Sequence, residues 1–261
     1  MAKAKENVKR SVTINGKEYT LRKSKFTVNE SPVIIHDNLT GKMSGVPGVS
    51  TSVLLNTICQ ERRKVNGAIC QNCFAVATVE RYSDLSKNCE SNYHLLTESV
   101  LPFELLPRFG NVRIARIEAF ADVQNETHAE NYINIIKANP KVVFGWWTKN
   151  VEIVSRVLDR TGKPKNLVLI QSAMFKNRPE KARSEYVDKV FTVYTDDYIK
   201  ELETVKECLK VLKGMSKKAA KAETTRIFER EFINCGGRSC VGCGKCYDTE
   251  NTVKEIKERL K

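Results

Sequence analysis

The sequence predicts an α/β protein with a parallel sheet, folded as a full or partial (βα) barrel of the TIM type. Apolar, β-rich runs recur every 23 to 30 residues, at 112–117, 142–147, 167–170 and 190–194. These runs are nearly continuous in apolar residues, which is typical of strands covered on both faces. A further strand is expected at 49–55, so we expect at least five βα units.

The start of the chain predicts a β-hairpin. Two alternating runs, SVTI and KEYTL, flank Asn15 and Gly16, and an Asn-Gly pair adopts the positive φ angles of a two-residue turn. We interpret the chain as one domain, with a hairpin extension at 1–30, a barrel core at 45–215 and a cysteine-rich segment at 225–261. No internal repeat or long low-complexity linker divides it.

Amphipathic helices are expected between and after the strands. The first should end before Pro140 and the second near Gly162. Their apolar stripes are Ala129, Tyr132, Ile133 and Ile136 in the first helix, Val151, Val154 and Leu158 in the second, and Tyr198, Leu202, Val205, Leu209 and Leu212 in a third.

The chain is basic, with 44 lysines and arginines against 31 aspartates and glutamates and a net charge of +13. Such a charge attracts nucleic acid when it is concentrated on one face. Most of the basic residues here are interleaved with acids, so we favour a solvated surface and keep a nucleic-acid partner as an alternative. The charged N-terminus has no apolar run behind it, which predicts no secretory signal, no membrane association and a cytoplasmic protein.

Nine cysteines provide the strongest functional pattern. Cys240, Cys243 and Cys246 are separated by two residues each, and Cys235 precedes Cys240 with four residues between them. The first spacing is that of bacterial ferredoxins, and the second is that of the plant type. Interspersed glycines allow a tight backbone wrap. Four thiolates also satisfy zinc, but three such closely spaced thiolates are crowded for one tetrahedron, so we favour an iron–sulfur cluster. The ligands predicted here are Cys235, Cys240, Cys243 and Cys246.

A second group, Cys59, Cys70 and Cys73, supplies three thiolates and leaves one position open. On a 4Fe-4S cluster the fourth iron then accepts an outside ligand, and on zinc a water remains for Lewis-acid chemistry. Two closed arrangements are alternatives. Either Cys89 or the nearby His94 completes the site, or Cys70 and Cys73 join Cys243 and Cys246 in one composite structural metal site.

Polar residues follow the predicted strands, and the carboxyl ends of parallel strands are where α/β proteins carry their chemistry. Loops are polar in any protein, so each of these residues also has a plain structural explanation. The candidates are Glu118, Asp122 and Lys149 for catalysis, and Trp147, Thr148 and Ser172 for binding a cofactor.

Four segments carry a resemblance to known families. They are ICQNCFA at 69–75, RIEAFADV at 116–123, FGWWTKN at 144–150 and GRSCVGCGKCY at 237–247. The first resembles the cluster-binding opening of radical S-adenosylmethionine (radical SAM) enzymes. The order of all four resembles a family of bacteriophage proteins described as gene product eighty-eight.

This resemblance implies a barrel related to radical SAM enzymes, with iron–sulfur clusters and with Asp122 and Lys149 at its mouth. It also implies S-adenosylmethionine as a candidate cofactor, a small-molecule substrate, an electron donor as partner, and the host cytoplasm as location. Departures weaken the enzymatic part: the opening triplet is not Cys-x3-Cys-x2-Cys, no Gly-Gly-Glu follows the second strand, and Ala121 replaces a glycine of the phage family.

The leading hypothesis is an iron–sulfur redox or radical enzyme with one open-site cluster and one auxiliary cluster. In it, Glu118 and Asp122 accept protons or hold a ligand, and Lys149 contacts an anion. The alternatives are a zinc-binding, nucleic-acid-associated protein and a non-catalytic iron–sulfur redox or scaffold protein.

Overall fold

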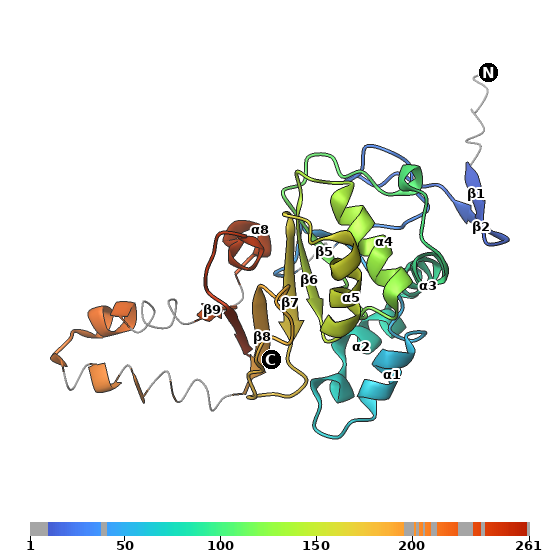
Figure 1. Ribbon diagram of the computed structural model, residues 1–261. Helices are drawn as coiled ribbons and strands as arrows, with labels where there is room; N and C mark the ends of the chain where they lie inside the picture. Colours follow the sequence, from blue (N-terminus) through green and yellow to red (C-terminus); the bar gives the residue numbers. More distant parts are fainter. Residues whose placement is uncertain are drawn as a thin grey trace, which may run out of the picture.

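An eight-stranded sheet forms the centre of the protein in the computed structural model, which describes residues 10–37, 41–195, 201, 204–205, 207–209, 213–223, 232–235 and 238–259. Its strands are β3 (His36–Asp37), β4 (Pro47–Val49), β5 (Ile114–Ile117), β6 (Val143–Thr148), β7 (Leu167–Ser172), β8 (Lys189–Tyr194), β9 (Phe232–Asn234) and β10 (Glu255–Arg259). They lie in the order β3-β4-β5-β6-β7-β8-β10-β9 (Figure 1). Within these residues β3 and β4 pair antiparallel, and the other neighbouring strands pair parallel.

The prediction of an α/β protein with a mostly parallel sheet is confirmed, and β5 to β8 coincide with four of the predicted strands. No closed barrel is found in the described part of the chain, where β3 and β9 form the two edges of the sheet. The strand expected at 49–55 is shorter and earlier, at β4. The chain turns away after Val49 because Ser50 and Thr51 bond to the segment beyond β5: Ala119 N donates to Ser50 Oγ, and Thr51 Oγ1 donates to Glu118 Oε1.

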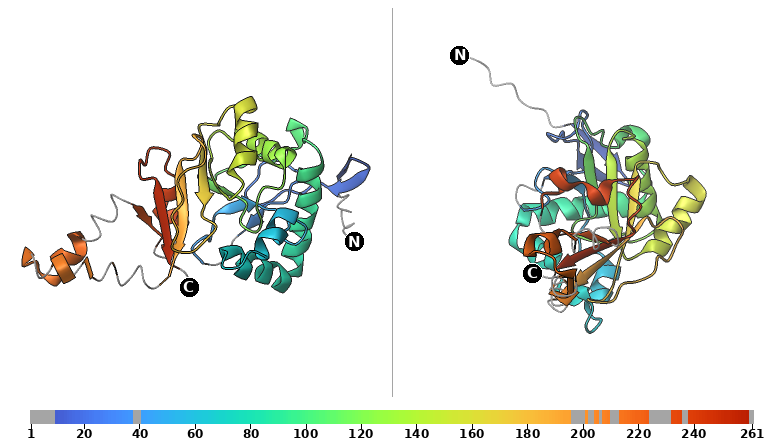
Figure 2. Two further views of the ribbon diagram at one scale, coloured as in Figure 1. Left: turned by 60° about the horizontal axis from the view of Figure 1, so that its bottom comes forward. Right: turned by 90° about the vertical axis from the view of Figure 1, so that its left-hand side faces the viewer.

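Three helices pack on one side of the sheet, and the main apolar core lies between them and the strands (Figures 1 and 2). They are α3 (Ser83–Glu98), α4 (Glu126–Lys137) and α5 (Val151–Thr161). The Asn125 side chain caps α4 by accepting from His128 N, which satisfies one of the free N–H groups of the first turn. Gly162, at φ +70°, ends α5 as predicted. Of the apolar stripe predicted for the third helix, Val205 and Leu209 lie among the described residues and the rest lies outside them.

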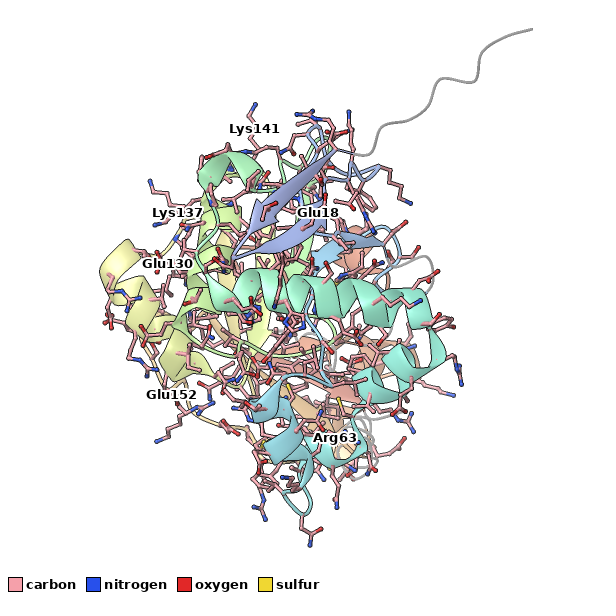
Figure 3. The ribbon with its side chains drawn as sticks, turned by 90° about the vertical axis from the view of Figure 1, so that its right-hand side faces the viewer. Glu18, Arg63, Glu130, Lys137, Lys141 and Glu152 are labelled. Atoms are coloured by element: carbon pink, nitrogen blue, oxygen red, sulfur yellow. The ribbon has the colours of Figure 1, made fainter. Side chains whose placement is uncertain are left out.

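The predicted hairpin is present as β1 (Ser11–Ile14) and β2 (Lys17–Thr20), with Asn15 and Gly16 at positive φ. It lies against α3, as Figure 3 shows. The Asn15 side-chain amide donates to Ser99 Oγ at 2.9 Å, and Lys17 pairs with Glu98 at 2.8 Å. The hairpin is therefore attached at the edge of the helical layer.

The opposite face of the sheet carries the C-terminal segment. It includes α8 (Cys240–Cys243) and the short 3-10 helix η3 (Lys245–Tyr247), and Tyr247 packs on Val46 and Ile114. At the carboxyl ends of the strands lie α1 (Thr57–Arg63), η1 (Ile69–Asn72) and α2 (Phe74–Arg81) (Figure 1). The two predicted cysteine groups thus occupy different places on the sheet. None of the helices in the described ranges is both long enough and apolar enough to span a membrane.

Candidate functional site

The four cysteines of the C-terminal segment line one hollow. Cys240 and Cys243 lie on α8, Cys246 lies on η3, and Cys235 follows β9. Gly244 joins α8 to η3 at φ +63°, a left-handed conformation that glycine adopts without strain. The chain reverses at Gly244, whose N donates to Cys240 O at 2.9 Å. This reversal brings Cys240, Cys243 and Cys246 to the side of the segment that faces the hollow.

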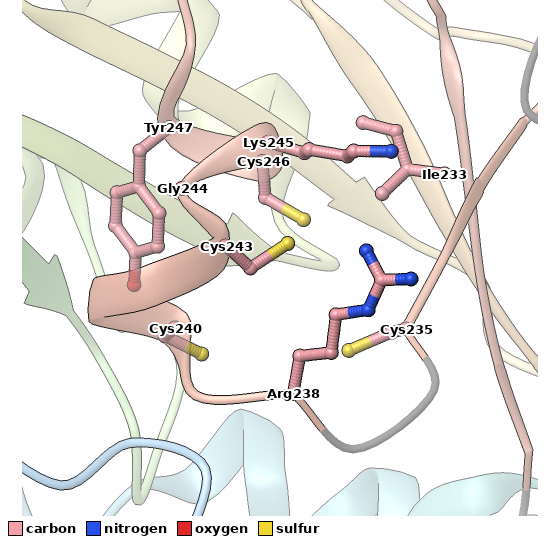
Figure 4. A pocket seen from close by; sticks show the side chains of 9 residues that line it. All are labelled: Ile233, Cys235, Arg238, Cys240, Cys243, Gly244, Lys245, Cys246 and Tyr247. Carbon is pink, nitrogen blue, oxygen red and sulfur yellow. The ribbon is translucent and has the colours of Figure 1, made fainter.

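The space between these residues is about 360 Å³, a volume that includes open solvent, and the hollow is partly open to its surroundings. Figure 4 shows the sulfurs of the four cysteines turned toward this space and the Arg238 side chain extending into it. Lys245 and Tyr247 also line it. From outside, Lys42 Nζ lies 3.5 Å from Cys235 Sγ and pairs with Glu258. The thiols are therefore surrounded by cationic side chains.

Burial controls the ionisation of these thiols. Burial and then the charges of the other three cysteines raise the pKa of Cys246 to about 12. Burial is also the largest cause of the raised pKa values of Cys235 and Cys240, and Lys42 opposes it in both. A thiol must lose its proton to bind a metal, so the raised pKa values of Cys235, Cys240 and Cys246 oppose metal binding until a cation offsets the charge of the thiolates.

The donor set of four thiols fits zinc or an iron–sulfur cluster by its chemistry. In the described part of the chain, however, no three Cys, His, Asp or Glu side chains form a group that holds a metal ion as they stand. The predicted metal centres thus remain predictions. The structure does bring the four C-terminal cysteines together around one hollow.

The first cysteine group lies on the α1–α2 unit at the carboxyl ends of the strands. Cys59 is on α1, Cys70 is on η1, and Cys73 precedes α2. Cys59 and Cys73 pack on the same apolar cluster as the buried Cys89. Burial, followed by the charges of Asp122 and Glu118, raises the pKa of Cys59. The lining of the C-terminal hollow includes neither Cys70 nor Cys73, so the described residues give no support to the composite site.

Asp122 is bonded on both of its carboxylate oxygens. Oδ1 accepts from Thr148 Oγ1 and from Val123 N, and Oδ2 accepts from Lys149 N at 2.9 Å and from Arg62 Nη1 at 2.8 Å. A carboxylate has about four acceptor positions, so this one is saturated. The geometry gives Asp122 a bracing role between α1, β5 and β6, and its predicted catalytic role remains a prediction.

Glu118 is a buried carboxyl group at the end of β5. Its backbone has φ +52°, which is strained for a residue with a side chain. Oε1 accepts from Thr51 Oγ1 and Tyr132 OH at 2.6 Å each, and Oε2 accepts from Thr51 N and Ala121 N at 3.2 Å each. Burial raises its pKa to about 7, although the hydrogen bonds from Thr51 and Tyr132 oppose the shift.

The remaining predicted residues divide between the two sides of the sheet. Thr148 and the backbone of Lys149 join Asp122, and Ser172 is buried at the end of β7, beside Phe191 of β8. Trp147 lies on the other face, where its ring packs against Arg116 and Tyr247. It therefore belongs with the C-terminal segment and not with Thr148.

The predictions from sequence missed several contributors to the site. Arg62 comes three residues after Cys59, a helical spacing that places both on neighbouring positions of α1. Tyr247 follows Cys246 directly, so the cysteine motif itself points to it. Lys42 and Arg116 carry no sequence signal, because strand pairing and long-range contacts alone bring them to the hollow.

Comparison with known proteins identifies the family. A family model described as Gene product 88 matches residues 41–249, which is more than half of the chain and includes both cysteine groups. No curated protein and no solved structure matches the chain, and the comparisons give no support to the resemblance to radical SAM enzymes. The family predicted from the order of the four segments is confirmed: the chain belongs to the Gene product 88 family.

Proposed function

We propose that this protein binds an iron–sulfur cluster through Cys235, Cys240, Cys243 and Cys246 and uses it for redox chemistry. One observation carries the proposal: four cysteines from α8, η3 and the end of β9 line a single hollow that is open to solvent. A cluster held there is close enough to solvent to exchange electrons with a partner.

The surroundings favour a cluster over a single zinc ion. Three cysteines separated by two residues each are crowded for the single tetrahedron that a zinc ion requires. A cluster spreads its irons over a larger volume and accepts more widely spaced thiolates. Lys42, Arg238 and Lys245 offset the negative charge of such a centre, and Lys42 Nζ reaches Cys235 Sγ at 3.5 Å, the type of contact that tunes a cluster's potential.

The proposal extends to Cys59, Cys70 and Cys73 as ligands of a second, open-site cluster. Its support is that Cys59 and Cys73 pack on one apolar cluster, and that Cys70 is close enough to influence the pKa of Cys59. A cluster with one open iron supplies a site for a small ligand, with S-adenosylmethionine as a candidate. The finer fold proposal, a partial barrel, places this ligand at the carboxyl ends of β4 to β7.

Anaerobic purification tests the first part directly. We expect iron and acid-labile sulfide in the native protein and the absorbance of an iron–sulfur centre. Cys243→Ser should lose most of the C-terminal cluster, and Cys70→Ser should lose the second centre only. Cys208→Ser is the matched control, since Cys208 is an exposed thiol outside both groups, and it should keep the full iron and sulfide content.

One outcome would replace the proposal. A colourless native protein with stoichiometric zinc and no sulfide makes the hollow a structural zinc site, and the protein a zinc-stabilised binding module. Nucleic-acid binding is then the next measurement, with an affinity that falls steeply as salt rises.

A further inference from the structure

A row of residues across the sheet holds Arg116 between two glycines. In register, Arg116 of β5 lies beside Gly48 of β4 and beside Gly145 of β6, and Gly48 pairs in turn with His36 of β3. Side chains of paired residues on neighbouring strands point to the same face. The two missing side chains therefore leave space on both sides of Arg116.

Aromatic rings fill that space. A Cβ atom on Gly48 would lie 2.5 Å from Nε2 of His36, and one on Gly145 would lie 2.6 Å from Trp147 and 2.7 Å from Tyr247. Cζ of Arg116 lies 4.2 Å from the centroid of the Trp147 ring, within the range of a cation–π interaction. The guanidinium is thus held in place by packing, and no carboxylate of the described residues pairs with it.

The hydrogen-bonding capacity of Arg116 is little used. Nε points to the carbonyl oxygen of Glu118 at 3.4 Å, and Nη1 faces the sulfur of Met43 at 3.9 Å. Among the ion pairs between described residues, none involves Arg116. A guanidinium has five N–H donors in a planar fork, so most of its donors face no acceptor in the described part of the chain.

Two neighbouring polar atoms are buried without a hydrogen-bond partner in the described structure, Tyr247 OH and His36 Nε2. Tyr247 is 4% exposed. The charge of Arg116 acts on both: it opposes the rise in the pKa of Tyr247, and it adds to burial in lowering the pKa of His36 to about 4. His36 is therefore neutral and able to donate from one ring nitrogen. Buried polar atoms are normally paired, and two of them beside a guanidinium with unused donors point to an oxyanion that the described residues do not provide.

We propose that Arg116, Tyr247 and His36 form a binding site for an oxyanion, the carboxylate or phosphate group of a small ligand, on the sheet face beside the four-cysteine hollow. The fork of Arg116 donates two parallel hydrogen bonds to such a group, the geometry in which arginine binds oxyanions most strongly. Tyr247 OH donates a third hydrogen bond, and Trp147 shields the guanidinium from water on one side. The charge of Arg116 also acts to lower the pKa of Cys240, so Arg116 is near this thiol. A ligand bound to Arg116 therefore adjoins the proposed cluster.

The site does not depend on a bound cluster, and direct titration tests it. The full-length protein, with its iron and sulfide content measured, is titrated with inorganic phosphate and separately with acetate at constant ionic strength. Tryptophan fluorescence is a suitable readout because the chain has two tryptophans, and one of them, Trp147, lies beneath Arg116. We expect saturable binding of at least one anion. Tighter binding of phosphate identifies the ligand group as a phosphate, and tighter binding of acetate identifies it as a carboxylate.

The variants separate a built site from general charge attraction. Arg116→Gln should weaken binding at least tenfold, Arg116→Lys by less because it keeps the charge, and Tyr247→Phe several-fold. Arg156→Gln, a change of an exposed arginine on the helical side, should leave the anion affinity unchanged. Circular dichroism and the unchanged iron content of each variant show that the fold is retained, and Tyr247→Phe still tests the site if Arg116→Gln does not fold.

Two results would overturn the proposal. One is the absence of saturable binding of either anion by the native protein. The other is an affinity that Arg116→Gln and Arg156→Gln lower equally, since this identifies net charge as the cause. Neither result bears on the metal, because iron and sulfide are measured on the same samples.

Discussion

Nη1 of Arg62 lies 2.8 Å from Oδ2 of Asp122, and the second terminal nitrogen of the same guanidinium donates to Oδ1 of Asn150. Arg62 is on α1, three residues after Cys59, whereas Asp122 follows β5 and Asn150 follows β6. The side chains of Arg62 and Asp122 are only 18% and 9% exposed. One arginine thus attaches the helix that carries Cys59 to the carboxyl ends of two strands.

Replacing Asp122 by Asn should destabilise the protein substantially. The change removes the only ion-pair partner of Arg62 among the described residues and turns an acceptor into a donor opposite Lys149 N. Breaking a largely buried ion pair from one side costs about 3 kcal/mol, which urea unfolding measures. The exposed pair of Glu126 and Arg156 supplies the control, since Glu126→Gln should change stability far less. Equal losses in the two variants would show that Asp122 is not a brace.

Glu118 should make stability depend on pH. Its pKa is about 7 in the folded protein against an ordinary value of 4.5, so the folded state binds more protons than the unfolded state between these values. The free energy of unfolding therefore falls as pH rises from 4.5 to 7, by about 3 kcal/mol for this group. Glu118→Gln lacks the titration and should lose this dependence.

The measurement for Glu118 is the difference in unfolding free energy between the native protein and Glu118→Gln, taken at pH 5 and at pH 8. The contribution of His36 is present in both proteins and cancels in the difference. His128 Nε2 lies 3.4 Å from Glu118 Oε1, but burial lowers the pKa of His128 to about 3, so its ring is neutral in the folded protein at both pH values. The variant should gain relative stability at the higher pH. A difference that is the same at both pH values would mean that Glu118 titrates normally.

The sequence predicts the central strands well because each is a nearly continuous apolar run between polar loops. The C-terminal strand β10 shows where this signal fails. Its residues, EIKER, contain one apolar side chain, Ile256, yet β10 lies between β8 and β9. Its neighbour β8 is about 60 residues away in the chain, and no local pattern specifies that pairing. The openness of the sheet was missed for the same reason, since closure depends on which strands form the edges.

The cysteine groups were predicted from spacing alone, because ligands of a compact centre must be close in the chain or at its turns. The sequence did not predict that the candidate residues divide between the two faces of the sheet. Trp147 and Thr148 are adjacent in β6 and point to opposite faces, so one joins Arg116 and the other joins Asp122. Alternation is visible in the sequence, but the neighbours on each face depend on long-range packing.

Cysteine labelling should distinguish packing thiols from ligands. Cys89 is 2% exposed, and burial raises its pKa from 9.0 to about 12, which lowers its thiolate fraction about a thousandfold relative to an ordinary thiol. Cys208 is exposed. With iodoacetamide and peptide mass spectrometry, Cys208 should be modified first and Cys89 only on unfolding. Modification of Cys89 together with Cys59 and Cys73 after treatment with a chelator would make it a fourth ligand.

Gly145 should not tolerate even a methyl group. In a strand, replacing glycine by alanine ordinarily stabilises by about 0.5–1 kcal/mol, but the added Cβ here would lie 2.6 Å from Trp147 and 2.7 Å from Tyr247. Both rings are packed, so the steric cost of about 1–3 kcal/mol should dominate. Gly145→Ala should therefore be less stable than the native protein, and by displacing Tyr247 it should also weaken anion binding.

Gly242 provides the matched control for Gly145. It lies on α8 between Cys240 and Cys243, and a Cβ there would meet nothing within 4 Å. Gly242→Ala should keep or slightly raise stability, because alanine favours a helix over glycine, and should bind anions as the native protein does. Thermal unfolding and phosphate titration of both variants make the comparison. If Gly145→Ala is as stable as Gly242→Ala and binds anions equally well, the rings are free to move aside, and the close packing around Arg116 does not hold its guanidinium in place.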